Sequence, residues 1–226
     1  MYGRTYNGGR EMSKEKTKAT VRGRRKADQQ SGRAALLSAG LRAFGDMGYE
    51  GASIRAIAQS AAVTPNLVAV HFGDKAGLWT ACVDWLAEEI APALESARAL
   101  EKAANLPLRA RLEMGLDLVA AFYTGNRDLR GFVARAATEP PERSLPVAEK
   151  LLKPIYRASL PLIEEGIRGG LLRASHPASV FVILHAVLGR PEQFSAVLSI
   201  IAPEVPERDA GQMLSDSLRQ MLLKNE

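Results

Sequence analysis

The chain has 226 residues, of which 46% are hydrophobic, so it is long enough to bury a core as one large domain or two modest ones. No stretch approaches the roughly 18 consecutive apolar residues of a membrane span. The first thirty residues lack the apolar core of a signal peptide, and the single cysteine, Cys82, excludes an intramolecular disulfide. These features predict a globular cytoplasmic protein.

The net charge of +5 is concentrated at the start of the chain. Residues 1–32 contain nine basic and three acidic residues, whereas residues 33–90 contain four basic and six acidic ones. Glycines at positions 3, 8, 9 and 23 and the scarcity of apolar side chains predict that residues 1–32 are a disordered basic arm. Such an arm either binds nucleic acid or is only a solvated terminus, and a neighbouring DNA-binding motif favours the first.

The chain becomes helical from Arg33, where apolar residues begin to recur at helical spacing. Gly48 is the expected end of this helix, because glycine commonly follows a helix C-terminus. The predicted apolar stripe consists of Leu36, Ala39, Gly40, Ala43, Phe44 and Met47.

Residues 53–72 predict two short helices joined by a tight turn. Ser53 is a good N-cap for the first helix. Thr64 can cap the second helix, with Pro65 at the first helical position, where its missing N–H costs nothing. The expected buried side of the second helix consists of Leu67, Val68 and Val70.

Small residues indicate how these two helices pack against each other. Two helices that cross steeply need a small residue at the crossing, here Ala58, a compact turn, here Ala62, and an aliphatic wedge, here Val68. This arrangement is typical of a helix-turn-helix, whose second helix enters the major groove of DNA. The alternative is an ordinary helical hairpin within a core.

The rest of the chain also predicts helices, so the fold class is all-α. Asp74 is the expected N-cap of a helix that runs to about Ile90. The β-branched run Val180–Leu184 is interpreted as a buried helix, because it follows a proline and continues into further apolar residues. Further helices are expected over about residues 92–100, 107–125, 129–136, 146–166, 177–200 with an interruption at 189–191, and 209–224.

Residues 33–86 resemble the DNA-binding domain of the tetracycline-repressor (TetR) family. The matching positions are Leu36-Leu37, Ala39, Phe44, Gly48-Tyr49, Ser53-Ile54, Ile57-Ala58, Ala61, Val63-Thr64-Pro65, His71-Phe72, Asp74-Lys75 and Leu78. The resemblance implies a helix-turn-helix domain over residues 33–90 and a helical effector-binding and dimerisation domain over residues 91–226. The second half resembles the family only in its layout.

Three positions depart from the family pattern. Ala62 stands where the turn commonly has glycine, and a positive φ there would cost an alanine roughly 1 kcal/mol. Ala69 stands where the family often has a phosphate-binding tyrosine, and Leu67 where it often has a small residue. We therefore expect fewer contacts with the DNA phosphate backbone, in a domain that already has little positive charge.

The predicted DNA-binding helix runs from Thr64 to Phe72. Asn66 is the candidate for direct base reading, because its amide can pair bidentately with adenine. The other candidate DNA contacts are Ser53, Arg55, Thr64, Pro65, His71 and Lys75, with Arg22, Arg24, Arg25 and Lys26 of the arm reaching an adjacent minor groove.

No constellation of residues points to enzyme chemistry, a metal or a cofactor. The three histidines, His71, His176 and His185, are far apart in sequence, and zinc-ligand spacings, phosphate-binding glycine loops and nucleophile elbows do not occur. His185 on an apolar helix is more often a core histidine than a base or a ligand. We therefore predict a protein that is not an enzyme and needs no cofactor.

The sequence predicts a homodimeric transcriptional repressor that a small-molecule effector releases from a palindromic operator. The alternative is a helical ligand- or protein-binding module whose DNA binding has weakened. The dimer interface is expected around residues 146–168 and 177–200. Some of the aromatic residues Phe122, Tyr123, Phe132 and Tyr156 are expected to line an apolar effector cavity, with Arg135 or His185 as a polar anchor, and plain core packing is the alternative for each of them.

Overall fold

The computed structural model describes residues 11–224, and side chains are described for residues 31–206 and 208–224. All regular elements of this part are helices, so the predicted all-α class is confirmed. They are α1 (Glu11–Gly51), α2 (Ile54–Ser60), α3 (Asn66–Phe72), α4 (Lys75–Glu89), α5 (Ala91–Lys102), α6 (Leu108–Gly125), α7 (Arg127–Ala136), α8 (Pro141–Val147), a π-turn (Ala148–Leu152), α9 (Lys153–Arg168), α10 (Pro177–Leu188), α11 (Pro191–Ile201), a 3-10 turn (Glu207–Asp209) and α12 (Ala210–Leu222).

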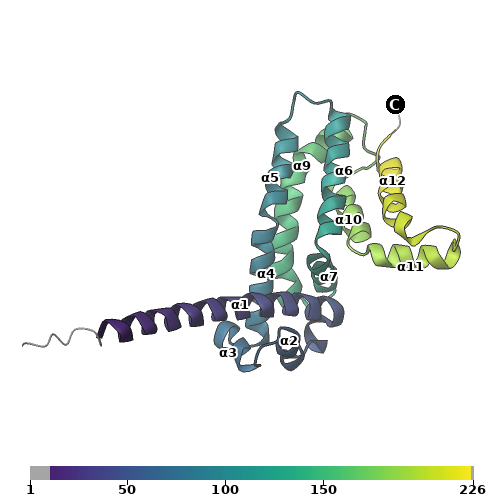
Figure 1. Ribbon diagram of the computed structural model, residues 1–226. Helices are drawn as coiled ribbons and strands as arrows, with labels where there is room; N and C mark the ends of the chain where they lie inside the picture. Colours follow the sequence, from purple (N-terminus) through teal and green to yellow (C-terminus); the bar gives the residue numbers. More distant parts are fainter. Residues whose placement is uncertain (1–10, 225–226) are drawn as a thin grey trace, which may run out of the picture.

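The helices form two connected bodies. Helix α1 lies across one end of the molecule, with α2 and α3 on its outer side (Figure 1). Helices α5, α6 and α9 form an upright bundle above α1, and α10, α11 and α12 lie along one side of that bundle (Figure 1). The α2–α3 pair is therefore presented at one end, away from most of the second half of the chain.

The first core joins α1–α4 to helices from the second half of the chain. Phe44, Ile57 and Leu78 are almost completely buried in it, as the apolar spacing predicts. Helix α7 contributes Phe132 to the same core, where its ring packs on those of Phe44 and Trp79. The first core therefore does not end at residue 90.

Helix α1 begins earlier than the sequence predicts. Its backbone is helical from Glu11, whereas residues 1–32 were expected to form a disordered arm. Residues 11–31 contain no proline and many lysine, arginine, glutamate, glutamine and alanine residues, which are good helix formers and extend the helix backwards. The side chains of Arg22, Arg24, Arg25 and Lys26 lie outside the described part, as do residues 1–10.

The end of α1 is set by Gly48, as predicted. Its φ of 74° and ψ of 177° interrupt the helix within the continuous assignment that runs to Gly51. Met47, predicted on the buried stripe, is 45% exposed, because it lies just before this break, where the chain turns away from the core.

The long helix predicted over residues 146–166 is divided in two. Helix α8 starts at Pro141, and a π-turn over Ala148–Leu152 separates it from α9. The N–H of Lys153 bonds to the carbonyl of Ala148, five residues back, and Pro154 has no N–H to continue the α-helical pattern. The proline therefore explains why this segment is not one regular helix.

The second core is built by α6, α9, α10 and α12. Leu112, Leu162, Leu184 and Leu218 are among its buried residues. The end of the chain is fixed to the α9–α10 junction, because Arg173 N donates to Leu222 O at 2.8 Å and Lys224 N donates to Leu171 O at 2.8 Å. These bonds hold α12 over the second core.

Candidate functional site

The turn between α2 and α3 fixes the position of the DNA-binding helix. Ala58 is fully buried at the crossing of the two helices, as predicted. Val63 N donates to Ala58 O at 3.0 Å, which closes the turn. Ala62 has a φ of 54°, which makes it the one non-glycine residue of residues 11–224 with a positive φ. The strain expected from the missing glycine is therefore present.

Replacing Ala62 with glycine should raise the free energy of unfolding by roughly 0.5–1 kcal/mol. The left-handed conformation costs alanine about 1–2 kcal/mol, and glycine relieves this strain. The greater conformational entropy of glycine in the unfolded chain offsets about 0.4–1 kcal/mol of that gain. Urea denaturation of the two proteins measures the difference. The control is Ala61→Gly, because Ala61 has a φ of −80° and gains nothing from glycine. A destabilised Ala62→Gly variant would contradict the strain.

Helix α3 turns one side outward and packs the other onto α1. Thr64, Pro65 and Asn66 are exposed at its beginning, while Val68 is buried. Leu67 packs inward, where its Cδ2 approaches Gly32 of α1 so closely that a Cβ at Gly32 would lie 2.8 Å away. The small residue in α1 therefore accommodates the large residue in α3.

Val70 was predicted on the buried side of α3, and that prediction is wrong. Its side chain is 60% exposed, and Ala69 beside it is exposed as well. Val70 lies four residues after Asn66, so both fall on the same face of the helix. Sequence reasoning missed Val70 because an apolar residue was assigned to the core, although its spacing from Asn66 was a usable signal.

The remaining predicted DNA contacts occupy different environments. Ser53 and Arg55 are exposed at the start of α2. Lys75, at the first position of α4, donates to Glu50 O at 3.2 Å and lies 4.7 Å from the ring centre of Tyr49. Its ammonium has three donors, so one bond to Glu50 leaves two for another partner. His71 is half-buried, and its Nε2 is shielded without a hydrogen-bond partner among the described residues.

The cap of α4 agrees with the sequence prediction. Asp74 Oδ1 accepts a hydrogen bond from Gly77 N at 2.7 Å. This bond fixes the start of α4 directly after α3, and with it the position of Lys75.

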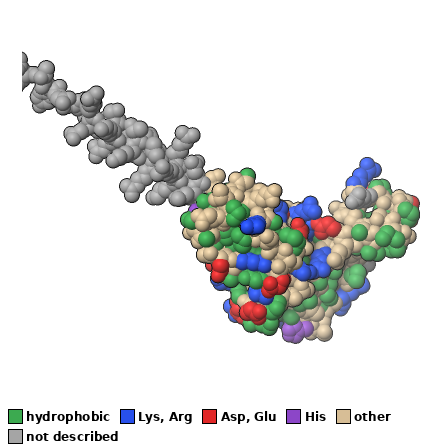
Figure 2. Space-filling view, turned by 90° about the horizontal axis from the view of Figure 1, so that it is seen from below, with side chains coloured by type: hydrophobic (Ala, Val, Ile, Leu, Met, Phe, Trp, Pro, Cys, Tyr) green, Lys and Arg blue, Asp and Glu red, His purple; other side chains and the backbone are tan. Residues whose placement is uncertain are grey.

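The outer face of the motif is not strongly basic. Figure 2, seen from below, shows Lys and Arg side chains interspersed with Asp and Glu rather than gathered into one patch. This agrees with the four basic and six acidic residues of residues 33–90. The described surface alone therefore supplies little attraction for a polyanion.

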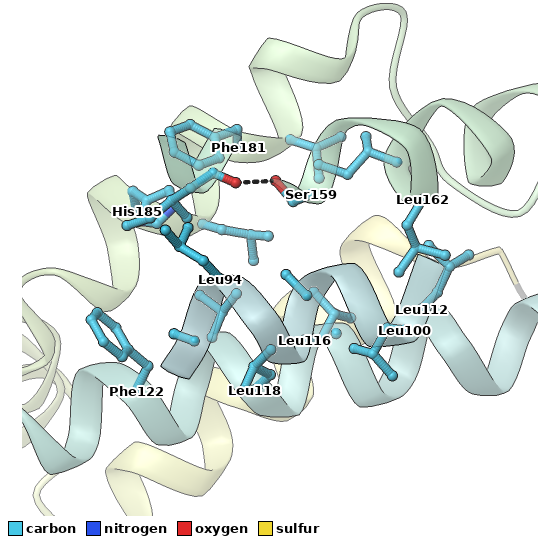
Figure 3. Close-up of a pocket in the computed structure, with 18 of the residues that line it drawn as sticks. Leu94, Leu100, Leu112, Leu116, Leu118, Phe122, Ser159, Leu162, Phe181 and His185 are labelled. Atoms are coloured by element: carbon cyan, nitrogen blue, oxygen red, sulfur yellow. Dashed lines mark hydrogen bonds between the residues drawn. The ribbon is translucent and has the colours of Figure 1, made fainter. Parts of the chain in front are cut away.

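An apolar cavity of about 100 Å³ lies between α5, α6, α9 and α10 (Figure 3). Phe122 and His185, two of the predicted residues, line it. The rest of the wall is mostly aliphatic and includes Leu94 and Leu100 from α5 and Leu112 and Leu116 from α6. The α5 residues were missed, because a short amphipathic helix carries the same pattern whether it covers a solid core or a cavity.

Two predicted aromatic residues lie behind the cavity wall. The hydroxyl of Tyr123 hydrogen-bonds to Nδ1 of His185, and the ring of Tyr123 is buried. Tyr156 packs edge-on against Phe181, with ring centres 5.2 Å apart, and Phe181 itself lines the cavity. Tyr123 and Tyr156 therefore support cavity residues without being part of the wall.

Phe132 and Arg135 are not brought to the cavity. Helix α7 packs along α1, so its apolar face, including Phe132, turns toward the first core. Arg135 lies on the outside near Gly48, with its Nε 4.0 Å from Glu139. The prediction of these two residues as cavity lining is corrected by the packing of α7.

Burial keeps the titratable groups near the cavity neutral. Burial lowers the pKa of His185 to about 4, so the imidazole is uncharged at neutral pH. Burial also raises the pKa of the Tyr123 hydroxyl above its ordinary value, so this hydroxyl keeps its proton. In the first core, burial raises the pKa of the Cys82 thiol to about 12, which makes it unreactive.

An exposed two-helix motif joined to a helical body with an internal apolar cavity is the architecture that helix-turn-helix regulators have. Residues 36–82 match the profile of the family described as "Bacterial regulatory proteins, tetR family". The segment that carries α2 and α3 is therefore similar to the DNA-binding domain of TetR-family transcriptional regulators.

One relative resembles this chain in sequence, and several solved structures resemble it in fold. The chain is 30% identical over 142 residues to the HTH-type transcriptional regulatory protein RaaS of Mycobacterium tuberculosis, which covers 63% of this chain and 60% of the length of that relative. The fold resembles that of HlyIIR, a hemolysin II transcriptional regulator, with a TM-score of 0.63 and 16% identity over 87% of this chain and 99% of that one. It also resembles FadR from Bacillus subtilis in complex with stearoyl-CoA, with a TM-score of 0.56 and 13% identity over 83% and 98% of the two chains.

Among residues 11–224, no helix combines the length and apolar character that crossing a membrane requires. Among the side chains of residues 31–206 and 208–224, no group of three or more His, Cys, Asp or Glu is placed to hold a metal ion.

Proposed function

We propose that the chain is a transcriptional repressor that binds a palindromic operator as a homodimer and is released by a small molecule bound in the α5–α6–α9–α10 cavity. The observation that carries the proposal is the exposed face of α3, which presents Asn66 and Val70 on a helix fixed by the α2–α3 turn. The named relatives are regulators, and the FadR structure holds stearoyl-CoA. Repression would act on the chromosome, in the cytoplasm.

Base reading is assigned to the outer face of α3. The amide of Asn66 pairs with an adenine, and the methyl groups of Val70, one helical turn later in α3, suit the methyl group of a thymine close to that adenine. Phosphate contacts from Ser53, Arg55, Thr64 and Lys75 set the position of α3 on the duplex. His71 contributes less, because its Nε2 is shielded from solvent.

Replacing Asn66 with alanine should cost about 1–3 kcal/mol of binding to the selected operator and little on random DNA, because it removes a base contact. An operator is first selected from a random duplex library, and binding is then measured by fluorescence anisotropy on both duplexes. The control is Arg55→Ala, an exposed residue of α2 that should weaken both affinities about equally. Equal losses on both duplexes for Asn66→Ala would refute its role.

A homodimer is expected because one short helix buries too little surface to hold a specific site alone. Large apolar side chains are exposed on α10, at Val182 (60%) and Ile183 (43%), and on α11, at Val197 (55%) and Ile200 (79%). Large exposed apolar side chains on two consecutive helices support an interface there. Two subunits joined there would place half-sites about one helical turn of DNA, ~10 bp, or a multiple of it apart.

The double variant Val182→Glu/Ile200→Glu should be a monomer in light scattering, because two charges on each subunit would be buried without partners. The wild-type chain should be a dimer at micromolar concentration. Met221→Glu is the matched control, because Met221 is 66% exposed on α12 outside the expected interface. A monomeric wild-type chain would contradict the proposed dimer.

A series of contacts through α7 supports coupling between the cavity and the DNA-binding helix. Tyr123, which bonds to the cavity residue His185, receives a hydrogen bond on its backbone oxygen from Arg130 Nη1 of α7 at 2.7 Å. Helix α7 in turn meets α1 so closely that a Cβ on Gly45 would lie 3.0 Å from the backbone of Gly131. In some dimer conformations the distance between the two α3 helices does not match the operator. A ligand that binds more tightly to such a conformation must weaken DNA binding by the same coupling free energy.

The second candidate function is a helical ligand- or protein-binding module with weakened DNA binding. The low positive charge of residues 33–90 and Ala69 at the position of the family tyrosine favour it. Mobility shifts with genomic fragments, with and without heparin, distinguish the two candidates. A specific complex that resists heparin favours the repressor, and binding that heparin abolishes favours the module.

A further inference from the structure

The chemistry of the cavity wall restricts which molecules can enter it. The wall contains no Asp, Glu, Lys or Arg, and its polar side chains are Ser159 and His185. The cavity extends from Leu100 and Leu112 at one end to Phe122, Phe181 and His185 at the other (Figure 3). The space is therefore elongated and almost entirely hydrocarbon-lined.

The two polar side chains offer few bonds to a ligand. The hydroxyl of Ser159 donates within α9, to Ile155 O at 3.1 Å and Tyr156 O at 3.1 Å, so only its lone pairs remain to accept a bond. Nδ1 of His185 is taken by Tyr123, and the ring carries no charge at neutral pH. A bound molecule therefore meets at most a hydroxyl acceptor and one imidazole nitrogen.

The buried arginines of the second half are engaged elsewhere. Arg111 bonds to both carboxylate oxygens of Glu165, at 2.6 and 2.9 Å, and Arg130 bonds to Tyr123 O and Glu192. Neither arginine lines the cavity. A carboxylate or phosphate drawn into this space would find no cation, and burying an unpaired charge costs several kcal/mol.

We infer that the cavity takes an uncharged lipophilic molecule, a short alkyl chain with at most one hydroxyl-type donor directed at Ser159. The assignment of the cavity as the regulatory site rests on the proposed function, whereas the class of ligand rests on the wall alone. A molecule with a charged head, such as an acyl thioester of a nucleotide, would have to keep that head outside the cavity.

Matched pairs of straight-chain ligands test the inference on the full chain. Hexan-1-ol, octan-1-ol and decan-1-ol are compared by calorimetry with hexanoate, octanoate and decanoate at about pH 8, where the carboxylic acids are ionised. We expect at least one alcohol to bind, with a dissociation constant at least about tenfold lower than that of its carboxylate. Equal or tighter binding of the carboxylates, or no binding of any alcohol, would overturn the inference.

Glycines of α6 provide the matched variants that locate the binding. Gly115 lines the cavity, and a Cβ there would meet Leu162 at 3.6 Å, so Gly115→Val fits the backbone and fills the space. Gly125→Val, on the same helix in open space, is the control. We expect alcohol binding to fall at least about tenfold in Gly115→Val and to persist in Gly125→Val. Unchanged binding in Gly115→Val would overturn the inference.

Measuring operator affinity in the presence of the bound alcohol separates this inference from the proposed function. If an alcohol binds in the cavity and lowers operator affinity, both are supported. If it binds there and leaves operator affinity unchanged, the class of ligand stands and the proposed regulatory role of the cavity fails.

Discussion

The Phe132→Ala variant should lose about 3–5 kcal/mol of the free energy of unfolding, as expected for removing a fully buried aromatic ring. Phe132 is 0% exposed. Its ring centre lies 4.6 Å from that of Trp79 and 6.4 Å from that of Phe44. The variant opens a cavity where α7 joins α1 and α4, so it weakens the contact between the DNA-binding motif and the rest of the chain. Urea denaturation measures the loss.

Phe122→Ala is the matched control for this prediction. Phe122 is half-buried and already borders the cavity, so its removal deprives fewer neighbours of packing contacts. We expect a clearly smaller loss of stability than for Phe132→Ala, together with a change in alcohol binding that Phe132→Ala does not show. Equal losses of stability would mean that Phe132 is not a central member of the first core.

Local signals in the sequence were sufficient for most of the helix boundaries. Gly48 interrupts α1 with a positive φ, Asp74 caps α4 through Gly77, and α10 starts at Pro177. Each of these effects depends on the residue itself and on neighbours within one helical turn. The strain at Ala62 belongs to the same class, because it follows from the turn type and the missing glycine.

Packing partners could not be predicted in the same way. The apolar stripe of α7 is compatible with the first core or with the cavity, and nothing within α7 decides between them. The structure places Phe132 in the first core because α7 lies along α1, which is a contact between residues far apart in sequence. For the same reason the contribution of Leu94 and Ser159 to the cavity was not foreseen.

The exposed face of α3 shows a different limit. Hydrophobicity assigned Val70 to the interior, yet the buried positions of α3 are taken by Val68 and, in part, by Leu67 against Gly32. A short helix packed on one side has few inward positions, so an additional apolar residue must face outward. In a DNA-binding helix such an exposed apolar residue is a candidate contact to a base.

The final prediction concerns the basic segment that precedes the described side chains. Residues 1–30 carry nine basic and three acidic residues, and residues 33–90 carry an excess of acidic ones. The backbone of α1 is helical from Glu11 and projects beyond α3 at the DNA-binding end of the molecule (Figure 1). We propose that Arg22, Arg24, Arg25 and Lys26 supply the DNA contacts that Ala69 and the weakly charged motif do not.

Deleting residues 1–30 should therefore weaken operator binding strongly at moderate salt and flatten its salt dependence. Each phosphate that a basic residue neutralises contributes about −0.9 to the slope of log affinity against log salt, so the loss of four contacts from each subunit of the proposed dimer changes the slope by roughly 7 units. Binding is measured at several salt concentrations, with light scattering and thermal unfolding to verify that the dimer and fold persist. Deletion of residues 1–10 is the control, because it retains Arg22, Arg24, Arg25 and Lys26 and should preserve most of the slope. If the longer deletion leaves affinity and slope unchanged, the segment is only a solvated terminus.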